Sequence, residues 1–188
     1  PRPETELIIE QLIKIYRGKS IKVLDIGVGS GCILISLLSE LVHSKGIGID
    51  ISKKALLIAE KNVKKHEVYK RIKLINKSFE DMYKREFDLI VSNPPYVKTS
   101  DIKNLDEDIK NYEPLIALDG GNDGLDVIRK VIYKTKYILK INGLFALEIG
   151  NEQYIKVSKI LKKNNFKVEK NIKDYNENTR CIISKLLK

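Results

Sequence analysis

The strongest constraint on the fold of this chain is a regular alternation of short apolar runs with amphipathic helical patterns. Runs rich in β-branched residues predict strands at 21–27, 45–50, 71–76, 87–93, 143–150, 166–172 and 180–187. Apolar residues at helical spacing predict helices at 5–16, 32–42, 53–65, 123–139 and 152–164, with an irregular loop at 94–122. Continuous apolar strands that alternate with helices form a parallel sheet covered on both faces. No helix separates the last two expected strands, so the last strand should run antiparallel.

The length and composition suit a single globular domain that spans residues 1–188. The chain is 43% hydrophobic and 32% charged, which is ordinary for a soluble protein. No apolar run reaches the roughly 18 residues that a membrane span needs, and no signal peptide opens the chain. Cys32 and Cys181 lack the spacing of a metal site and are expected to be packed thiols. We therefore expect a cytoplasmic protein without a metal and without a membrane partner.

Three polar or glycine-rich stretches come directly after expected strands. They are DIGVGSG at 25–31, GIDIS at 48–52 and SNPPYV at 92–97. Ligands of open α/β sheets bind at the carboxyl ends of the strands, near the switch in strand order. The glycines of the first stretch allow a tight turn and a close backbone approach, and the following helix offers free N–H groups. Asp50 ends the next strand, where its carboxylate can bind both hydroxyls of a ribose, so a nucleoside-bearing cofactor is predicted.

The glycine-rich turn is closer to a methyltransferase motif than to a dinucleotide-binding motif. An NAD fingerprint needs Gly or Ala at its sixth position, where this chain has Cys32, so an NAD-dependent oxidoreductase is disfavoured. The run Asp25-x-Gly27-x-Gly29-x-Gly31 resembles motif I of class I S-adenosylmethionine-dependent methyltransferases, which have a Rossmann-like, mostly parallel seven-stranded sheet. The resemblance implies S-adenosylmethionine as cofactor and S-adenosyl-L-homocysteine as product. The implied cofactor contacts are Gly27, Val28, Gly29, Ser30 and Gly31 at the amino-acid part, Asp50 and Ile51 at the ribose, and Ser78 and Phe79 at the adenine.

The stretch Asn93-Pro94-Pro95-Tyr96 leaves a buried strand through a rigid, extended segment. Neither proline donates a backbone hydrogen bond, and Pro94 keeps Asn93 out of the helical region. A planar amide or amine nitrogen is a poor nucleophile because its lone pair is delocalised. A methyl-transfer site must therefore accept its two N–H bonds and turn the lone pair toward the methyl carbon. The Asn93 side-chain oxygen and the Pro94 carbonyl can accept them, and Tyr96 offers a packing face. We interpret residues 93–96 as an amine clamp, in which Asn93 also contacts the cofactor.

Clamps of this type are similar to those of methyltransferases that act on adenine, on guanine N2 or on protein glutamine, and longer stretches narrow the resemblance. PRPETE at 1–6, YEPLIALDGGNDGLDVIRK at 112–130 and LEIGNEQ at 147–153 are similar to the HemK/PrmC family. That resemblance covers nearly the whole chain. It implies methylation of the glutamine side-chain amide in the Gly-Gly-Gln loop of peptide chain release factors. It further implies that Arg2–Glu6 close over the site, although Thr5 could equally serve only as a helix cap.

Two features depart from that family. Ser78 stands where an acidic residue is usual, which puts the adenine contact in doubt, and Phe79 could instead be a core residue. The family also has a helical N-terminal domain that helps to dock the release factor, and this chain lacks it. The chain is therefore expected to be the catalytic domain of a longer protein, with weak or no activity on the intact protein substrate when alone.

The charge pattern favours a protein substrate over a nucleic acid. The whole chain has a net charge of +10. Residues 97–127 hold eight acidic residues against three lysines, which gives −5 beside the clamp and leaves +15 for the rest. A phosphate backbone would be repelled there, whereas a basic protein loop would be attracted. Direct nucleic-acid binding is therefore not expected, and a release factor is the expected partner.

Three alternatives stay open. The first is a nucleic-acid amino-methyltransferase acting on adenine N6 or guanine N2 through the same clamp. The second is a ribosomal-protein glutamine methyltransferase, although that enzyme lacks the PETE run. The third is a cofactor-binding domain that regulates or scaffolds without turnover.

Overall fold

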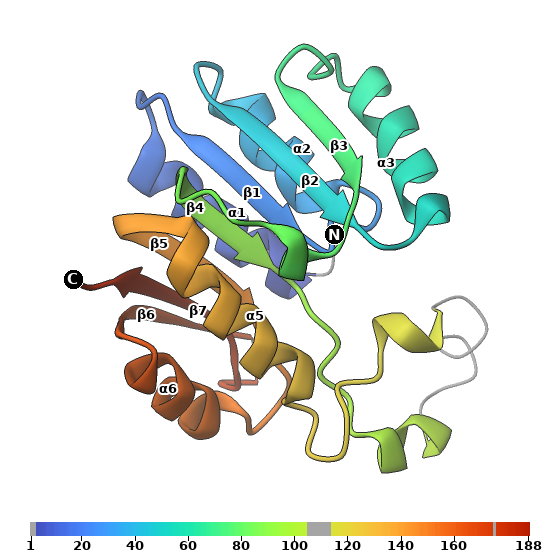
Figure 1. The fold of residues 1–188 in the computed structure, drawn as a ribbon, viewed down its shortest axis with the longest axis vertical. Coiled ribbons are helices and arrows are strands. Elements are labelled where there is room, and N and C mark those ends of the chain that lie inside the picture. The colour runs from blue at the N-terminus through green and yellow to red at the C-terminus, as the bar shows by residue number, and fades with distance from the viewer. Residues whose placement is uncertain (1–2, 105–113, 175) are drawn as a thin grey trace.

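The computed structural model describes residues 3–104, 114–174 and 176–188, and its strands form one mixed sheet (Figure 1). The strands are β1 (Lys22–Ile26), β2 (Lys45–Asp50), β3 (Ile72–Asn76), β4 (Phe87–Ser92), β5 (Leu139–Glu148), β6 (Phe166–Lys173) and β7 (Thr179–Leu186). Their order is β3-β2-β1-β4-β5-β7-β6. Neighbours from β3 to β5 pair in parallel, and β7 runs antiparallel to both β5 and β6. The predicted α/β fold with an antiparallel last strand is confirmed.

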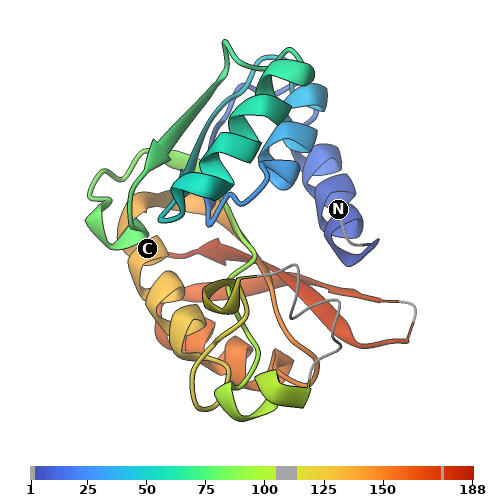
Figure 2. The same ribbon diagram turned by 90° about the vertical axis from the view of Figure 1, so that its right-hand side faces the viewer.

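Helices cover both faces of the sheet. They are α1 (Pro3–Tyr16), α2 (Cys32–Glu40), α3 (Lys53–Lys65), α5 (Asp126–Ile138) and α6 (Tyr154–Lys163). Helices α1, α2 and α3 lie on one face and α5 and α6 on the other (Figures 1 and 2). Successive strand residues point to opposite faces. Val23 therefore joins the core under α2, and Leu24 joins the core under α5.

Helix α5 and strand β5 differ from the sequence prediction at their boundaries. The helix begins at Asp126 rather than at 123 and ends at Ile138, and β5 follows directly from Leu139. The β4–β5 register shifts between Phe87, opposite Leu139, and Leu89, opposite Leu144. Asn142 has φ 65° within this irregular stretch. The Asn142-Gly143 pair therefore marks a bulge inside the strand, not the loop before it.

The expected loop at 94–122 contains two short 3₁₀ helices, η2 (Thr99–Asn104) and η3 (Leu115–Ala117), and a third, η1 (Phe79–Asp81), follows β3. Asp106, Glu107, Asp108, Lys110 and Glu113 of the predicted acidic loop lie outside the described residues. Within the described parts of the chain, no helix combines the length and the apolar character needed to cross a bilayer.

The strand order changes direction between β1 and β4, which are central neighbours. In doubly wound sheets the crevice outside the carboxyl ends at such a point is the ligand site. The glycine-rich turn follows β1, Asp50 ends β2 and the amine clamp follows β4. The fold therefore brings the three predicted stretches to one edge of the sheet.

Candidate active site

The glycine-rich turn between β1 and α2 adopts a conformation that favours glycine. Gly27, Gly29 and Gly31 have φ values of 72°, 54° and 84°. At Gly31 an added Cβ would also lie 2.9 Å from Ile35 Cδ1. The amides of Gly27 and Val28 donate to the Ile49 carbonyl at 2.9 and 3.0 Å, which ties the turn to the end of β2. Ser30 lies exposed between two of the glycines. The turn is thus a fixed backbone cradle open to a ligand.

Asp50 connects this turn to the end of β2. Its carboxylate accepts from the Gly29 amide at 3.0 Å and from the Ser52 amide at 2.8 Å. A carboxylate has about four acceptor positions, so two stay available for a ligand diol. Asn76 Nδ2 donates to the carbonyls of Asp50 and Ile51 at 2.9 and 3.0 Å, which holds the end of β2 against β3. Ile51 itself is 59% exposed beside this carboxylate.

Ser78 and Phe79 lie at the same sheet edge, directly after β3. The Ser78 hydroxyl accepts from the Glu80 amide at 3.2 Å and so caps η1. Phe79 is half-buried and packs against the core on the α5 side. The expectation that Phe79 could be a core residue is therefore correct, and its side chain stays partly accessible.

Asp25 lies below the glycine-rich turn rather than in contact with solvent. The residue is 1% exposed, and neither carboxylate oxygen has a hydrogen-bond partner among the described groups. Burial raises the pKa of Asp25 to about 7; the backbone amide of Leu34, which lies outside hydrogen-bond geometry, partly opposes this rise, and the charge of Asp50 adds to it. At mildly acid pH the carboxyl of Asp25 is therefore neutral, below the N-terminus of α2.

The amine clamp begins where β4 ends. Ser92 Oγ donates to the Ile26 carbonyl at 2.9 Å and so joins the ends of β4 and β1. Asn93 is half-buried, and its carboxamide makes no hydrogen bond to any described residue. Pro94 is buried, whereas Pro95 and Tyr96 are half-buried. The clamp therefore offers an uncommitted amide beside the glycine-rich turn.

A second segment, residues 118–124, holds the clamp from outside. The Val97 amide donates to the Leu118 carbonyl at 3.0 Å, and the Gly120 amide donates to the Val97 carbonyl at 2.8 Å. An added Cβ at Gly120 would lie 2.9 Å from the Pro95 carbonyl oxygen, so the two segments pack backbone to backbone. The glycines of the GGNDG run thus do more than form a turn.

Sequence reasoning missed two residues that contact Tyr96. Gln153, before α6, donates to the Tyr96 carbonyl at 3.0 Å. Arg180 of β7 lies 3.4 Å from the Tyr96 hydroxyl, with its guanidinium 5.9 Å from the ring centroid. Gln153 stands in the LEIGNEQ stretch, so the family resemblance was a signal for it. Arg180 had no signal in the sequence.

The start of α1 reaches the same edge of the sheet. Thr5 is buried, and its hydroxyl donates to Glu148 Oε2 at 2.8 Å across 143 positions of sequence. The helix begins at Pro3, so the reading of Thr5 as only a helix cap is wrong. Arg2 lies outside the described residues. Elsewhere in the described chain, no group of three or more His, Cys, Asp or Glu side chains is arranged to hold a metal ion.

Comparison with known proteins identifies the relatives of this fold. The chain is 37% identical over 187 residues to a release factor glutamine methyltransferase of Agrobacterium fabrum, covering 97% of this chain and 65% of that protein. It is also 37% identical to one of Caulobacter vibrioides (97% and 64% covered) and 39% identical to one of Fusobacterium nucleatum (98% and 53% covered). The chain thus spans between about half and two thirds of these relatives. The predicted resemblance to release-factor glutamine methyltransferases is confirmed.

Solved structures show the same fold at lower identity. A ribosomal protein L11 methylase of Lactobacillus delbrueckii subsp. bulgaricus superposes with a TM-score of 0.73 at 19% identity, covering 98% of this chain and 80% of that one. A magnesium protoporphyrin IX methyltransferase of Synechocystis with bound S-adenosylmethionine gives 0.69 at 14% identity, covering 97% and 77%. The fold is that of S-adenosylmethionine-dependent methyltransferases. The family model described as "Methyltransferase small domain" matches residues 3–110, and the chain therefore belongs to that family.

Proposed function

We propose that this chain transfers a methyl group from S-adenosylmethionine to the side-chain amide nitrogen of the glutamine in the Gly-Gly-Gln motif of peptide chain release factors. The observation that carries the proposal is the uncommitted carboxamide of Asn93, held at the end of β4 next to the glycine-rich turn after β1. The names of the relatives that the chain resembles over 97–98% of its length support this substrate.

The residues present fit the cofactor. When bound, S-adenosylmethionine supplies an electrophilic methyl group. The turn from Gly27 through Val28, Gly29 and Ser30 to Gly31 would hold its amino-acid part, because the backbone there is fixed and approachable. Asp50 would accept the ribose hydroxyls with its two remaining acceptor positions, beside Ile51. Ser78 and Phe79 would border the adenine, with the ring of Phe79 as the contact, since the Ser78 hydroxyl is engaged in capping η1.

The clamp would act by positioning the acceptor amide. Asn93 Oδ1 and the Pro94 carbonyl would accept its two N–H bonds, and the ring of Tyr96 would pack against its plane. This orientation turns the nitrogen lone pair toward the methyl carbon, at the 3–3.5 Å that a productive approach requires. Pro94 and Pro95 keep the acceptors rigid because their φ angles are fixed. In such a transfer the methyl carbon would leave the sulfur of the cofactor as it bonds to the nitrogen, and the nitrogen would then lose one proton to water.

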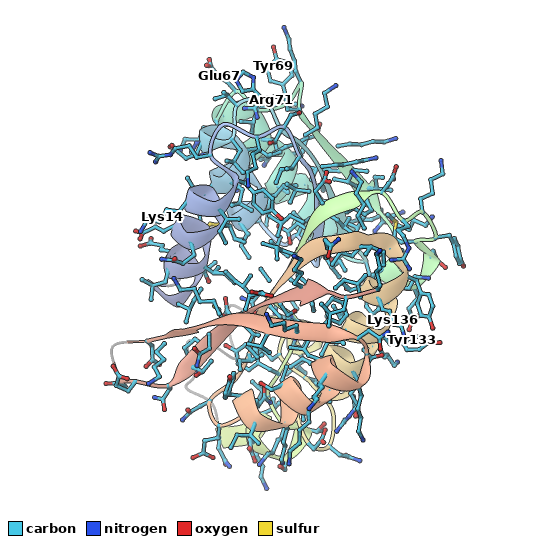
Figure 3. All side chains as sticks on the ribbon, turned by 90° about the vertical axis from the view of Figure 1, so that its left-hand side faces the viewer. Lys14, Glu67, Tyr69, Arg71, Tyr133 and Lys136 are labelled. Carbon is cyan, nitrogen blue, oxygen red and sulfur yellow. The ribbon has the colours of Figure 1, made fainter. Side chains whose placement is uncertain are left out.

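The charge distribution supports a protein substrate. Basic side chains gather away from the clamp: Lys22, Lys45, Lys70, Arg71 and Lys73 line one pocket at the amino ends of β1, β2 and β3, where Figure 3 labels Arg71. The acidic stretch beside the clamp adds a field that disfavours phosphates there.

The test is methyl transfer from labelled S-adenosylmethionine to four acceptors: a release factor, the same factor with its motif glutamine changed to Ala, duplex DNA and total RNA. The chain is assayed alone and also joined to an upstream region taken from a relative. We expect label on the intact release factor and on none of the other three acceptors. Label on nucleic acid would overturn the substrate while leaving the clamp chemistry in place, and no label on any acceptor in either form would leave a cofactor-binding domain without turnover.

A further inference from the structure

Gln153 joins three segments that meet behind the amine clamp. Its Oε1 accepts from the Gly150 amide at 2.9 Å. Its Nε2 donates to the Tyr96 carbonyl at 3.0 Å and to the Gly124 carbonyl at 3.2 Å. The residue is 9% exposed, so these bonds form away from water, where the loss of a partner is costly. One side-chain amide thus connects the end of β5, the clamp and the 118–124 segment.

The packing around this amide leaves little room for movement. An added Cβ at Gly124 would lie 2.5 Å from the Tyr96 carbonyl oxygen and 2.9 Å from Gln153 Nε2. An added Cβ at Gly150 would lie 2.9 Å from Tyr96 Cδ2 and 3.0 Å from Gln153 Oε1. Gly124 therefore packs against the Tyr96 carbonyl and Gly150 against the Tyr96 ring, and both lie against the side-chain amide of Gln153.

The clamp needs such an external anchor for a chemical reason. Pro94 and Pro95 have no N–H groups, so this part of the segment cannot donate to a neighbouring strand as β4 does. Its carbonyl oxygens can still accept hydrogen bonds, either from the rest of the protein or from a ligand. Gln153 engages the Tyr96 carbonyl, whereas the Asn93 carboxamide makes no hydrogen bond to any described residue.

We propose that Gln153 is the positioning residue of the amine clamp: it fixes the Tyr96 carbonyl and so sets the geometry in which residues 93–96 hold the acceptor amide. The catalytic part of this inference rests on the proposed function. The side-chain hydrogen bonds of Gln153 go to Gly150, Tyr96 and Gly124, and not to the glycine-rich turn or Asp50. Replacement of Gln153 should therefore affect turnover while leaving cofactor affinity in place.

The test compares Gln153→Met with Asn164→Leu. Each change replaces an amide by an apolar side chain of similar size, and Asn164 makes its 2.9 Å bond to the Ile160 carbonyl at the far end of α6. We expect kcat of Gln153→Met to fall by on the order of 10²-fold, the effect of a misplaced reacting group, with the cofactor Kd within about twofold of wild type. Asn164→Leu should change neither. A loss of cofactor affinity in parallel with kcat would show a merely structural role and overturn the inference.

Hydrogen exchange tests the same inference without any methyl acceptor. In Gln153→Met the Val97 amide should exchange on the order of tenfold faster, since the lost bonds are worth about that factor, while amides of β4 exchange as in wild type. Unchanged exchange at Val97, or an equal increase in β4, would overturn the inference. Gln153→Glu, which keeps the acceptor for Gly150, repeats the measurement if Gln153→Met does not fold. If the wild-type chain labels no acceptor while Gln153→Met shows the selective increase at Val97, the anchoring is supported and the proposed function is rejected.

Discussion

At the scale of single residues, Asn93 should separate chemistry from folding. Its carboxamide is half-buried and makes no hydrogen bond within the described chain, so Asn93→Ala should change the free energy of unfolding by less than about 0.5 kcal/mol. Turnover should fall by on the order of 10²–10³-fold, the loss seen when one oriented polar group is removed from an active site. Single-turnover rates and thermal unfolding check both values, and unchanged turnover would remove Asn93 from the mechanism.

Asp174 serves as a matched control for Asp50, because each carboxylate accepts hydrogen bonds from two backbone amides. Asp50 accepts two backbone amides at the cofactor site, and Asp174 accepts the amides of Asn176 and Asn178 in the β6–β7 turn, at 2.9 and 3.0 Å. Asp50→Ala should weaken cofactor binding by about 2–3 kcal/mol, the scale of charge-assisted hydrogen bonds. Asp174→Ala should leave it unchanged. Calorimetric titration measures both, and equal affinities for the two variants would place the ribose elsewhere.

Asp25 should make stability depend on pH in a defined window. The folded state holds the proton up to about pH 7, whereas the unfolded chain releases it near 3.8. The folded state therefore binds more protons between these values, and wild-type stability falls as pH rises through the window. Asp25→Asn lacks this slope. The difference in unfolding free energy between Asp25→Asn and wild type should shift in favour of the variant by on the order of 4 kcal/mol from pH 4 to pH 8. Urea unfolding without cofactor measures this difference. A constant difference would contradict the buried, proton-holding carboxyl.

At the scale of elements, apolar periodicity predicted each strand and helix of the sheet, because both are short-range patterns. The boundaries of these elements depend on individual side chains, which apolar periodicity does not take into account. Asp123 was expected inside α5, but its carboxylate accepts from the Leu125 amide at 3.1 Å and pairs with Arg129, which forms a turn before the helix. The strand was expected to begin at Gly143, directly after Asn142, whereas this pair lies in a bulge inside β5.

The site was predictable where it consists of strand ends, because the carboxyl ends of parallel strands meet at one edge. The glycine-rich turn, Asp50 and the clamp belong to this class. Gln153 and Arg180 do not, since they reach Tyr96 across 57 and 84 positions of sequence. No local pattern encodes a contact over such separations, so the packing that fixes the clamp became visible only in three dimensions.

The first helix should contribute stability through one buried hydrogen bond. Thr5→Val removes the hydroxyl that donates to Glu148 at 2.8 Å and should cost about 1–3 kcal/mol of unfolding free energy. Thr135→Val is the control: that hydroxyl is fully buried in α5 without a hydrogen-bond partner among the described groups, so its removal should be neutral or stabilising. Urea unfolding at pH 7 compares the two. Equal effects would mean that the link between α1 and β5 carries no stability.

At the scale of the whole molecule, a basic body carries an acidic stretch beside the clamp. Reversing the charges at Asp106–Glu107–Asp108, which lie outside the described residues, should slow association with a basic protein substrate. The slowing should shrink as ionic strength rises, because added salt screens exposed charges. Stopped-flow association at two salt concentrations measures this effect. An unchanged association rate would show that these acids only solvate the loop.

The central claim is that one crevice, at the carboxyl ends of β1, β2 and β4, holds both the cofactor and a glutamine amide. A crystal structure with S-adenosyl-L-homocysteine and a peptide containing Gly-Gly-Gln tests it most directly. We predict the ribose at Asp50, and the glutamine nitrogen within hydrogen-bonding distance of Asn93 Oδ1 and the Pro94 carbonyl, with its plane against Tyr96. A glutamine bound away from residues 93–96, or a cofactor that does not contact the Gly27–Gly31 turn, would contradict the claim.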